Sequence, residues 1–125
     1  MSTQDIARRL VELCRAGAFE QALEELYADD AVSIEPDDIP PGALSNAEGL
    51  DAILRKSRRF WGGVETLHSV RCSEPLVAAR WFSTALSVDV TFKGVGRIDI
   101  REICVYRVRD GLIVLEQFFY DTYEP

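Results

Sequence analysis

The stretch GRIDIREICVYRVR (residues 96–109), followed by Asp110-Gly111 and LIVLEQFFYDTY (residues 112–123), determines the fold class. Both segments are rich in β-branched and aromatic residues, and an Asp-Gly pair between two such runs is typical of a β-hairpin. Within residues 96–109, apolar residues alternate with charged ones, as in a strand with one face on a core. The sequence therefore predicts a long antiparallel hairpin.

Two segments before this hairpin, residues 64–73 and 76–93, have the same composition and are bounded by the turn signals SEP and KGVG. Four consecutive strands with short turns predict an antiparallel meander. Since residues 76–93 are too many for a flat strand, we expect this strand to bend at a bulge and to curve the sheet.

The first half of the chain has helical periodicity. Apolar residues recur at helical spacing after a Ser2 or Thr3 cap and again from Ala18, and Asn46 can cap a third helix that ends near residues 61–63. Residues 31–36 (AVSIEP) predict a short strand, and residues 37–45 a loop rich in proline. Helices that cover one face of a curved antiparallel sheet define an α+β fold.

Composition limits the classes of function. The 125 residues fit one domain, 1–125, and 14 Lys and Arg against 21 Asp and Glu give a net charge of -7. Such a surface repels phosphates, so we expect no nucleic acid and no membrane as partner. The absence of a signal-like start predicts a cytoplasmic protein. One histidine, scattered cysteines and the lack of a phosphate-binding loop predict neither a metal nor a cofactor.

Two polar residues fall on apolar rows of the predicted sheet. Glu102 lies in the inner row of residues 96–109, and a buried carboxylate must be paired, protonated or open to a wet pocket. A structural ion pair with Arg80 is the alternative. His68 lies in the more apolar row of residues 64–73, either as a core histidine or as an acid or base beside Glu102.

Two motifs resemble a known family. LYADDAVSIEP (residues 26–36) resembles the start of the nuclear transport factor 2-like superfamily, which includes ketosteroid isomerases and SnoaL-like polyketide cyclases. EICVYRVRDGLIVLEQFFYD (residues 102–121) resembles the final hairpin of SnoaL-like domains. The resemblance implies a cone of three helices wrapped by a curved sheet, with a pocket at the open end.

The resemblance also implies roles for individual residues. Glu35, just before Pro36, occupies the position of the general base of the isomerases, whereas the residues alone describe a solvated glutamate at a strand end. The two oxyanion-hole positions fall on Leu10 and Cys104, which are not strong hydrogen-bond donors. One such donor is worth roughly 3 kcal/mol, so steroid isomerisation is not expected, and Glu102 is a candidate for a displaced acid.

The expected pocket is largely apolar, with Glu102 and His68 as its polar floor. Its predicted ligand-binding residues are Leu10, Phe60, Trp61, Phe82, Cys104 and Phe119. Two functions stay open. One is a cofactor-free isomerase or cyclase that uses Glu35, Glu102 and His68 on an apolar carbonyl or polyketide-like compound. The other is a non-catalytic domain that binds a hydrophobic small molecule or acts as a dimeric scaffold.

The last strand is apolar on both of its faces. One row carries Ile113, Leu115 and Phe119, and the other carries Leu112, Val114, Phe118 and Tyr120. Because the helices can cover only one face of the sheet, we predict a homodimer through the outer face, with Phe118 in the contact.

Overall fold

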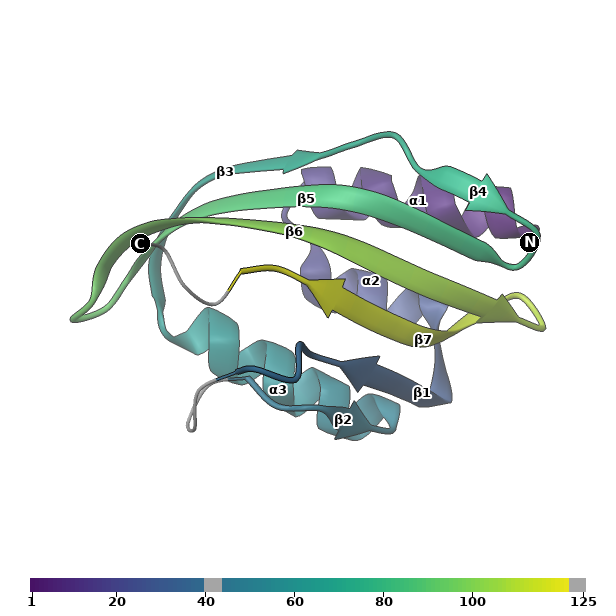
Figure 1. Ribbon diagram of the computed structural model, residues 1–125, viewed down its shortest axis with the longest axis horizontal. Helices are drawn as coiled ribbons and strands as arrows, with labels where there is room; N and C mark the ends of the chain where they lie inside the picture. The colour runs from purple at the N-terminus through teal and green to yellow at the C-terminus, as the bar shows by residue number, and fades with distance from the viewer. Residues whose placement is uncertain (40–43, 122–125) are drawn as a thin grey trace.

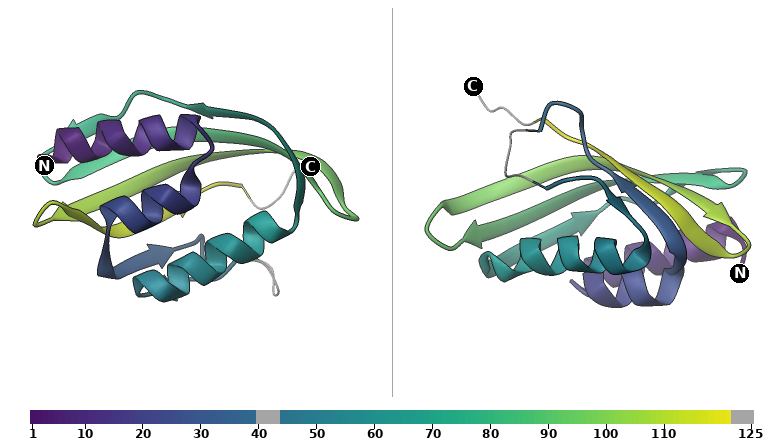
Figure 2. Two further views of the ribbon diagram at one scale, coloured as in Figure 1. Left: turned by 180° about the vertical axis from the view of Figure 1, so that it is seen from behind. Right: turned by 90° about the horizontal axis from the view of Figure 1, so that it is seen from below.

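The computed structural model describes residues 1–39 and 44–121, and in this part three helices lie on the concave face of one curved sheet (Figures 1 and 2). The helices are α1 (Thr3–Arg15), α2 (Phe19–Leu26) and α3 (Leu50–Gly62). The strands are β1 (Tyr27–Ile34), β2 (Ala47–Glu48), β3 (Val64–Cys72), β4 (Leu76–Ala78), β5 (Trp81–Phe92), β6 (Gly96–Arg109) and β7 (Leu112–Phe119). The predicted α+β class is confirmed.

The strand order is β2-β1-β7-β6-β5-β3, and β4 pairs with β5. Strands β3, β5, β6 and β7 form the predicted antiparallel meander, in which β5 and β6 pair without a break from Trp81–Arg107 to Phe92–Gly96. Strand β1 joins β7 in parallel, with Ile34 opposite Gln117, so the sheet is mixed. This pairing brings the residues that follow β1 close to those that follow β7.

Several element boundaries differ from the sequence-based predictions; the strand predicted for residues 31–36, for example, is β1 (Tyr27–Ile34). The predicted strand of residues 76–93 is two strands, because Ala79 takes a left-handed φ of 54° and β4 folds back on β5. Helix α3 begins after Gly49, whose φ is 90°, and not after Asn46. The Asn46 side chain accepts a hydrogen bond from the Glu35 backbone N–H at 2.7 Å instead. Residues 40–43 of the predicted loop lie outside the described residues.

A bulge in β7 exchanges the two faces of this strand. Arg107 pairs with Leu115 but Val108 pairs with Ile113, so Val114 is an extra residue. Since one extra residue reverses the alternation of side chains, Phe118 faces inward and Phe119 is 49% exposed. The prediction that Phe118 lies on the outer face is wrong for this reason. Phe119 does not line the cavity between the sheet and the helices, but it lines a second pocket that also includes Glu102 and Tyr120.

Candidate functional site

A cavity of about 830 Å³ lies between the concave face of the sheet and the helices. Its size is in the range of small-molecule sites. The apolar part of its wall includes Leu10, Leu23, Ile53, Phe60, Trp61, Leu86, Ile100 and Phe118. Exposed lining residues, among them Asp99, Arg101 and Asp121, mark where the cavity opens to solvent.

Aromatic rings build one side of this cavity. Trp61, at the end of α3, stacks on Phe19 with ring centroids 4.8 Å apart and meets Phe60 edge-on at 5.0 Å. Phe60 in turn contacts Phe92 of β5 at 5.4 Å. These contacts join α2, α3 and the sheet, so the wall is a packed unit.

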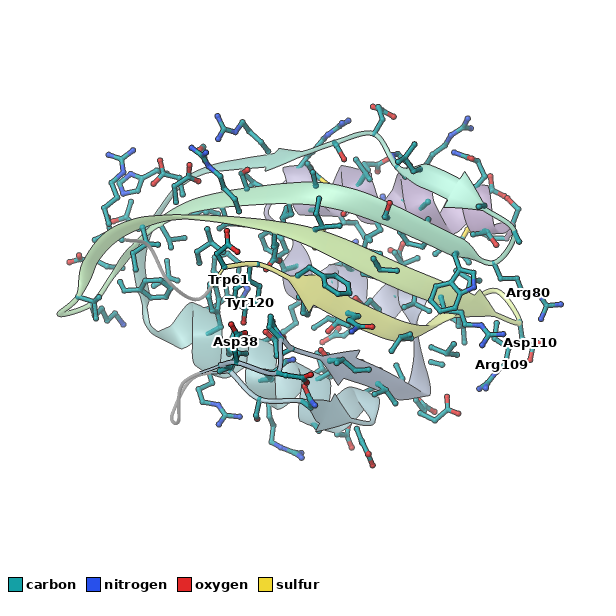
Figure 3. The ribbon with its side chains drawn as sticks, viewed as in Figure 1. Asp38, Trp61, Arg80, Arg109, Asp110 and Tyr120 are labelled. Carbon is teal, nitrogen blue, oxygen red and sulfur yellow. The ribbon has the colours of Figure 1, made fainter. Side chains whose placement is uncertain are left out.

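Glu35 is buried and lines the cavity directly after β1. Its Oε2 accepts a hydrogen bond from Lys56 Nζ of α3 at 2.9 Å, and its Oε1 accepts one from the Tyr120 hydroxyl at 2.6 Å. Burial, followed by the hydrogen bond to Glu35 and the charge of that carboxylate, raises the pKa of Tyr120, so this hydroxyl keeps its proton. Figure 3 shows Tyr120 and Trp61 in the same half of the molecule, away from the end that carries Arg80.

A second buried carboxyl, Glu116 of β7, extends this polar cluster. Lys56 Nζ also donates to Ser33 Oγ at 2.7 Å, and Ser33 hydrogen bonds to Glu116. The Tyr27 hydroxyl donates to the same carboxyl. Burial raises the pKa of Glu116, although the hydrogen bonds from Ser33 and Tyr27 oppose the shift. The result is one continuous buried network that runs from Tyr120 to Tyr27.

Glu102 of β6 lines the cavity outside this network. Its hydrogen-bond partner is the Cys104 thiol, whose Sγ lies 3.5 Å from Oε1, and within residues 1–39 and 44–121 it forms no ion pair. Burial, followed by the negative charges of Glu35 and Glu116, raises its pKa to about 7. A carboxyl with this pKa can take or release a proton near neutral pH.

The predicted alternative for Glu102, an ion pair with Arg80, is wrong. Arg80 lies in the turn before β5, where Trp81 pairs with Arg107, whereas Glu102 pairs with Leu86 much further along the hairpin. Figure 3 shows Arg80 at the right-hand end of the molecule.

Some of the predicted site residues line the cavity and others do not. Leu10, Phe60, Trp61, Glu35 and Glu102 line the cavity, as expected. Cys104 is fully buried and does not line the cavity, but its thiol donates a hydrogen bond to Glu102, which does. Phe82 does not line the cavity, because it stacks on Tyr106 at 4.7 Å within the core.

His68 is exposed and lies outside the cavity, so the prediction that it forms the pocket floor is wrong. Leu67 pairs with Val90 and Ser69 with Asp89, so His68 is the extra residue of a β3 bulge. Its Nε2 lies 2.7 Å from the hydroxyl of Thr91.

The lining residues that sequence reasoning missed include four that matter for the polar cluster and its surroundings: Lys56, Glu116, Phe118 and Tyr120. Lys56 could have been found, because its spacing from Ile53 and Phe60 places it on the same helical face as these apolar residues. The inward direction of Glu116 and Phe118 depends on the β7 bulge, which has no clear signature in the sequence.

Within the described part of the chain, no group of three or more His, Cys, Asp and Glu side chains is placed to hold a metal ion. None of the helices described has the length and hydropathy needed to cross a membrane.

This fold, with a cavity between one curved sheet and its helices, defines a small-molecule pocket protein. A SnoaL-like domain model matches residues 1–120, and the chain belongs to this family, within the nuclear transport factor 2-like superfamily. No curated protein matches the sequence significantly.

Solved structures agree with this assignment. A SnoaL-like polyketide cyclase candidate from Mesorhizobium loti is 30% identical, with a TM-score of 0.83 over 96% of this chain and 100% of that one. A protein of the nuclear transport factor 2-like type from Burkholderia pseudomallei is 18% identical, with a TM-score of 0.80 over 98% and 93% of the two chains. A protein with a ketosteroid isomerase-like fold from Catenulispora acidiphila, solved with trimethylamine, is 18% identical, with a TM-score of 0.72 over 94% and 85%.

Proposed function

We propose that this protein is a cofactor-free enzyme of the isomerase or cyclase type, in which Glu102 transfers a proton to or from an apolar carbonyl or polyketide-like compound. The observation that carries the proposal is the position of Glu102, a carboxyl with a pKa of about 7 that faces a largely apolar cavity. Proton transfer is most efficient when the pKa of the catalytic group lies near the working pH.

Glu35 is the second candidate for the base. Both of its carboxyl oxygens already accept hydrogen bonds, from Lys56 Nζ and from the Tyr120 hydroxyl, and Lys56 also forms an ion pair with it. These contacts favour Glu102 as the group that exchanges the proton, and Glu35 as a fixed negative charge.

Exchange of hydrogen for deuterium next to a carbonyl tests this function. Apolar ketones of graded size are incubated with the protein in deuterated water, and the loss of the α-hydrogen signals is followed by NMR. We expect Glu102→Gln to abolish exchange and Glu48→Gln, which alters an exposed glutamate in β2, to leave it unchanged. Full exchange by Glu102→Gln would remove Glu102 as the acid or base, and loss in Glu35→Gln alone would assign the role to Glu35.

A non-catalytic domain that binds a hydrophobic ligand is the alternative. Leu10 and the fully buried Cys104, at the positions of the family's oxyanion donors, favour it. Binding of apolar compounds in the cavity without any exchange would support this alternative.

We also propose that the protein forms a homodimer through the outer face of the sheet. Large apolar side chains on this face are exposed, namely Trp81, Ile103, Leu112 and Phe119. A second copy of the same sheet can cover them by two-fold pairing.

A further inference from the structure

Lys56 is a buried cation in the wall of an apolar cavity. The chain has two lysines, Lys56 and Lys93, and only Lys56 is buried. A buried ammonium is costly unless hydrogen bonds and an opposite charge stabilise it. Its position between Ile53 and Phe60 on the inward face of α3 therefore calls for an explanation.

The partners of Lys56 hold its ammonium in one place. Nζ donates to Ser33 Oγ at 2.7 Å and to Glu35 Oε2 at 2.9 Å, and it lies 5.6 Å from the centre of the Phe118 ring. Glu35 is itself fixed by the Tyr120 hydroxyl and, at its backbone N–H, by Asn46. The cation is thus preorganised before any ligand arrives.

The ammonium retains capacity for a ligand. A lysine ammonium has three N–H donors, and the two hydrogen bonds above use two of them. Among the described lining residues the other cation is Arg101, which is exposed and donates to Asp99 at 3.1 Å. Among the described lining residues Lys56 is therefore the cation best placed to meet a ligand oxygen inside the cavity.

We propose that Lys56 binds an oxygen of the ligand that is anionic or becomes anionic, so that the ligand class is apolar phenols and enolisable carbonyl compounds. Glu35 is then a positioning residue that holds the ammonium. The enolisable part of this class rests on the proposed function. A donor at Lys56 also explains how the chain can act without donors at Leu10 and Cys104.

The proton transfer balances with these groups alone. A C–H bond next to the carbonyl breaks, its proton moves to the ionised carboxylate of Glu102, and its electron pair becomes part of an enolate. Glu102 becomes neutral in this step, and the negative charge is then on the enolate oxygen beside Lys56. Return of the proton to the same or another carbon regenerates the carboxylate, so no oxidant or reductant is required.

Binding of 4-nitrophenol, with 4-nitrotoluene as an uncharged probe of similar shape, tests the proposal without any turnover. The wild-type protein should bind the phenolate more tightly than nitrotoluene. Lys56→Met should weaken phenolate binding by roughly 10- to 100-fold, the value of a hydrogen bond to a charged group. Lys56→Arg should keep most of the preference, and Lys93→Met, a change at the exposed lysine, should keep all of it.

Two further variants distinguish a specific loss of phenolate binding from a loss of folding. Lys56→Met with Glu35→Gln removes both charges of the pair, and it should bind nitrotoluene normally but show no preference for phenolate. Glu35→Gln alone should bind phenolate at least as tightly as wild type, because Lys56 loses a competing anion. Equal phenolate preference in wild type and the double variant, or no preference in wild type, would overturn the proposal. Phenolate binding that depends on Lys56 but no deuterium exchange would refute only the proposed catalysis.

Discussion

Lys56 and Glu35 form an ion pair in which the side chains are only 8% and 3% exposed, with Nζ and Oε2 2.9 Å apart. The two residues come from α3 and from the end of β1, so the pair links a helix to the edge region of the sheet. A buried pair of this kind is sensitive to the loss of one partner, because the remaining charge stays buried.

The first prediction concerns this pair and the stability of the fold. Lys56→Met should lower the free energy of unfolding by about 3–5 kcal/mol, since it leaves the Glu35 carboxylate uncompensated. Lys56→Met combined with Glu35→Gln should recover most of this loss. Urea denaturation of the three proteins measures both values, and a double variant no more stable than Lys56→Met would contradict the prediction.

The second prediction concerns pH. The pKa of Glu102 is about 7 in the folded protein against an ordinary value of 4.5, so folding favours its protonated form. Its contribution to stability is fully present below pH 4.5 and is lost as pH rises towards about 7. Glu102→Gln cannot ionise, so its stability relative to wild type should increase across this interval and then level off. Denaturation midpoints at closely spaced pH values check the trend, and a constant difference would argue against it.

The third prediction separates the two faces of β7. Phe119→Asp places a charge on the exposed outer face and should convert the proposed dimer to a monomer, as seen by light scattering at micromolar concentration. Phe118→Asp instead changes the cavity wall beside Lys56, so it should reduce binding of nitrotoluene. A monomeric wild-type protein would refute the dimer.

The fourth prediction uses the turn between β4 and β5. Ala79 has a φ of 54°, a conformation that glycine adopts without steric cost. Ala79→Gly should therefore stabilise the protein by about 0.5–1 kcal/mol, because relief of roughly 1–2 kcal/mol of left-handed strain exceeds the roughly 0.5–1 kcal/mol of extra conformational entropy that glycine loses on folding. The matched control, Ala78→Gly, lies in β4 and should destabilise it. If thermal unfolding shows both changes to be destabilising, the turn carries no such strain.

The sequence was sufficient for the parts of the fold that depend on regular periodicity. The alternation in residues 96–109 correctly placed Glu102, Cys104 and Tyr106 on the inner face, because β6 pairs with β5 without interruption. His68 was misplaced because β3 has an extra residue at this position. Bulges arise from tertiary packing and twist, and a single sequence carries little local record of them.

The candidate site was predictable in part for a similar reason. Glu102 stood out as a charge in an apolar row, and Glu35 was found only through the family resemblance. Lys56 was readable as a lysine on the apolar face of a helix, yet its partners come from β1 and could not be deduced from α3 alone. Tyr120 depends on the parallel pairing of β1 with β7, which joins distant segments of the chain.

The extra residue at Val114 has a consequence for how this chain can change over generations. Phe118 and Phe119 are neighbours in sequence, but one contacts the cavity and the other faces outward. Deletion of a single codon in β7 would exchange the directions of Phe118 and Phe119. It would therefore change both the surroundings of the ligand and the surface that a second molecule could contact. If the proposed dimer forms, ligand preference and self-association are therefore not independent traits in this family member, because one backbone irregularity sets both.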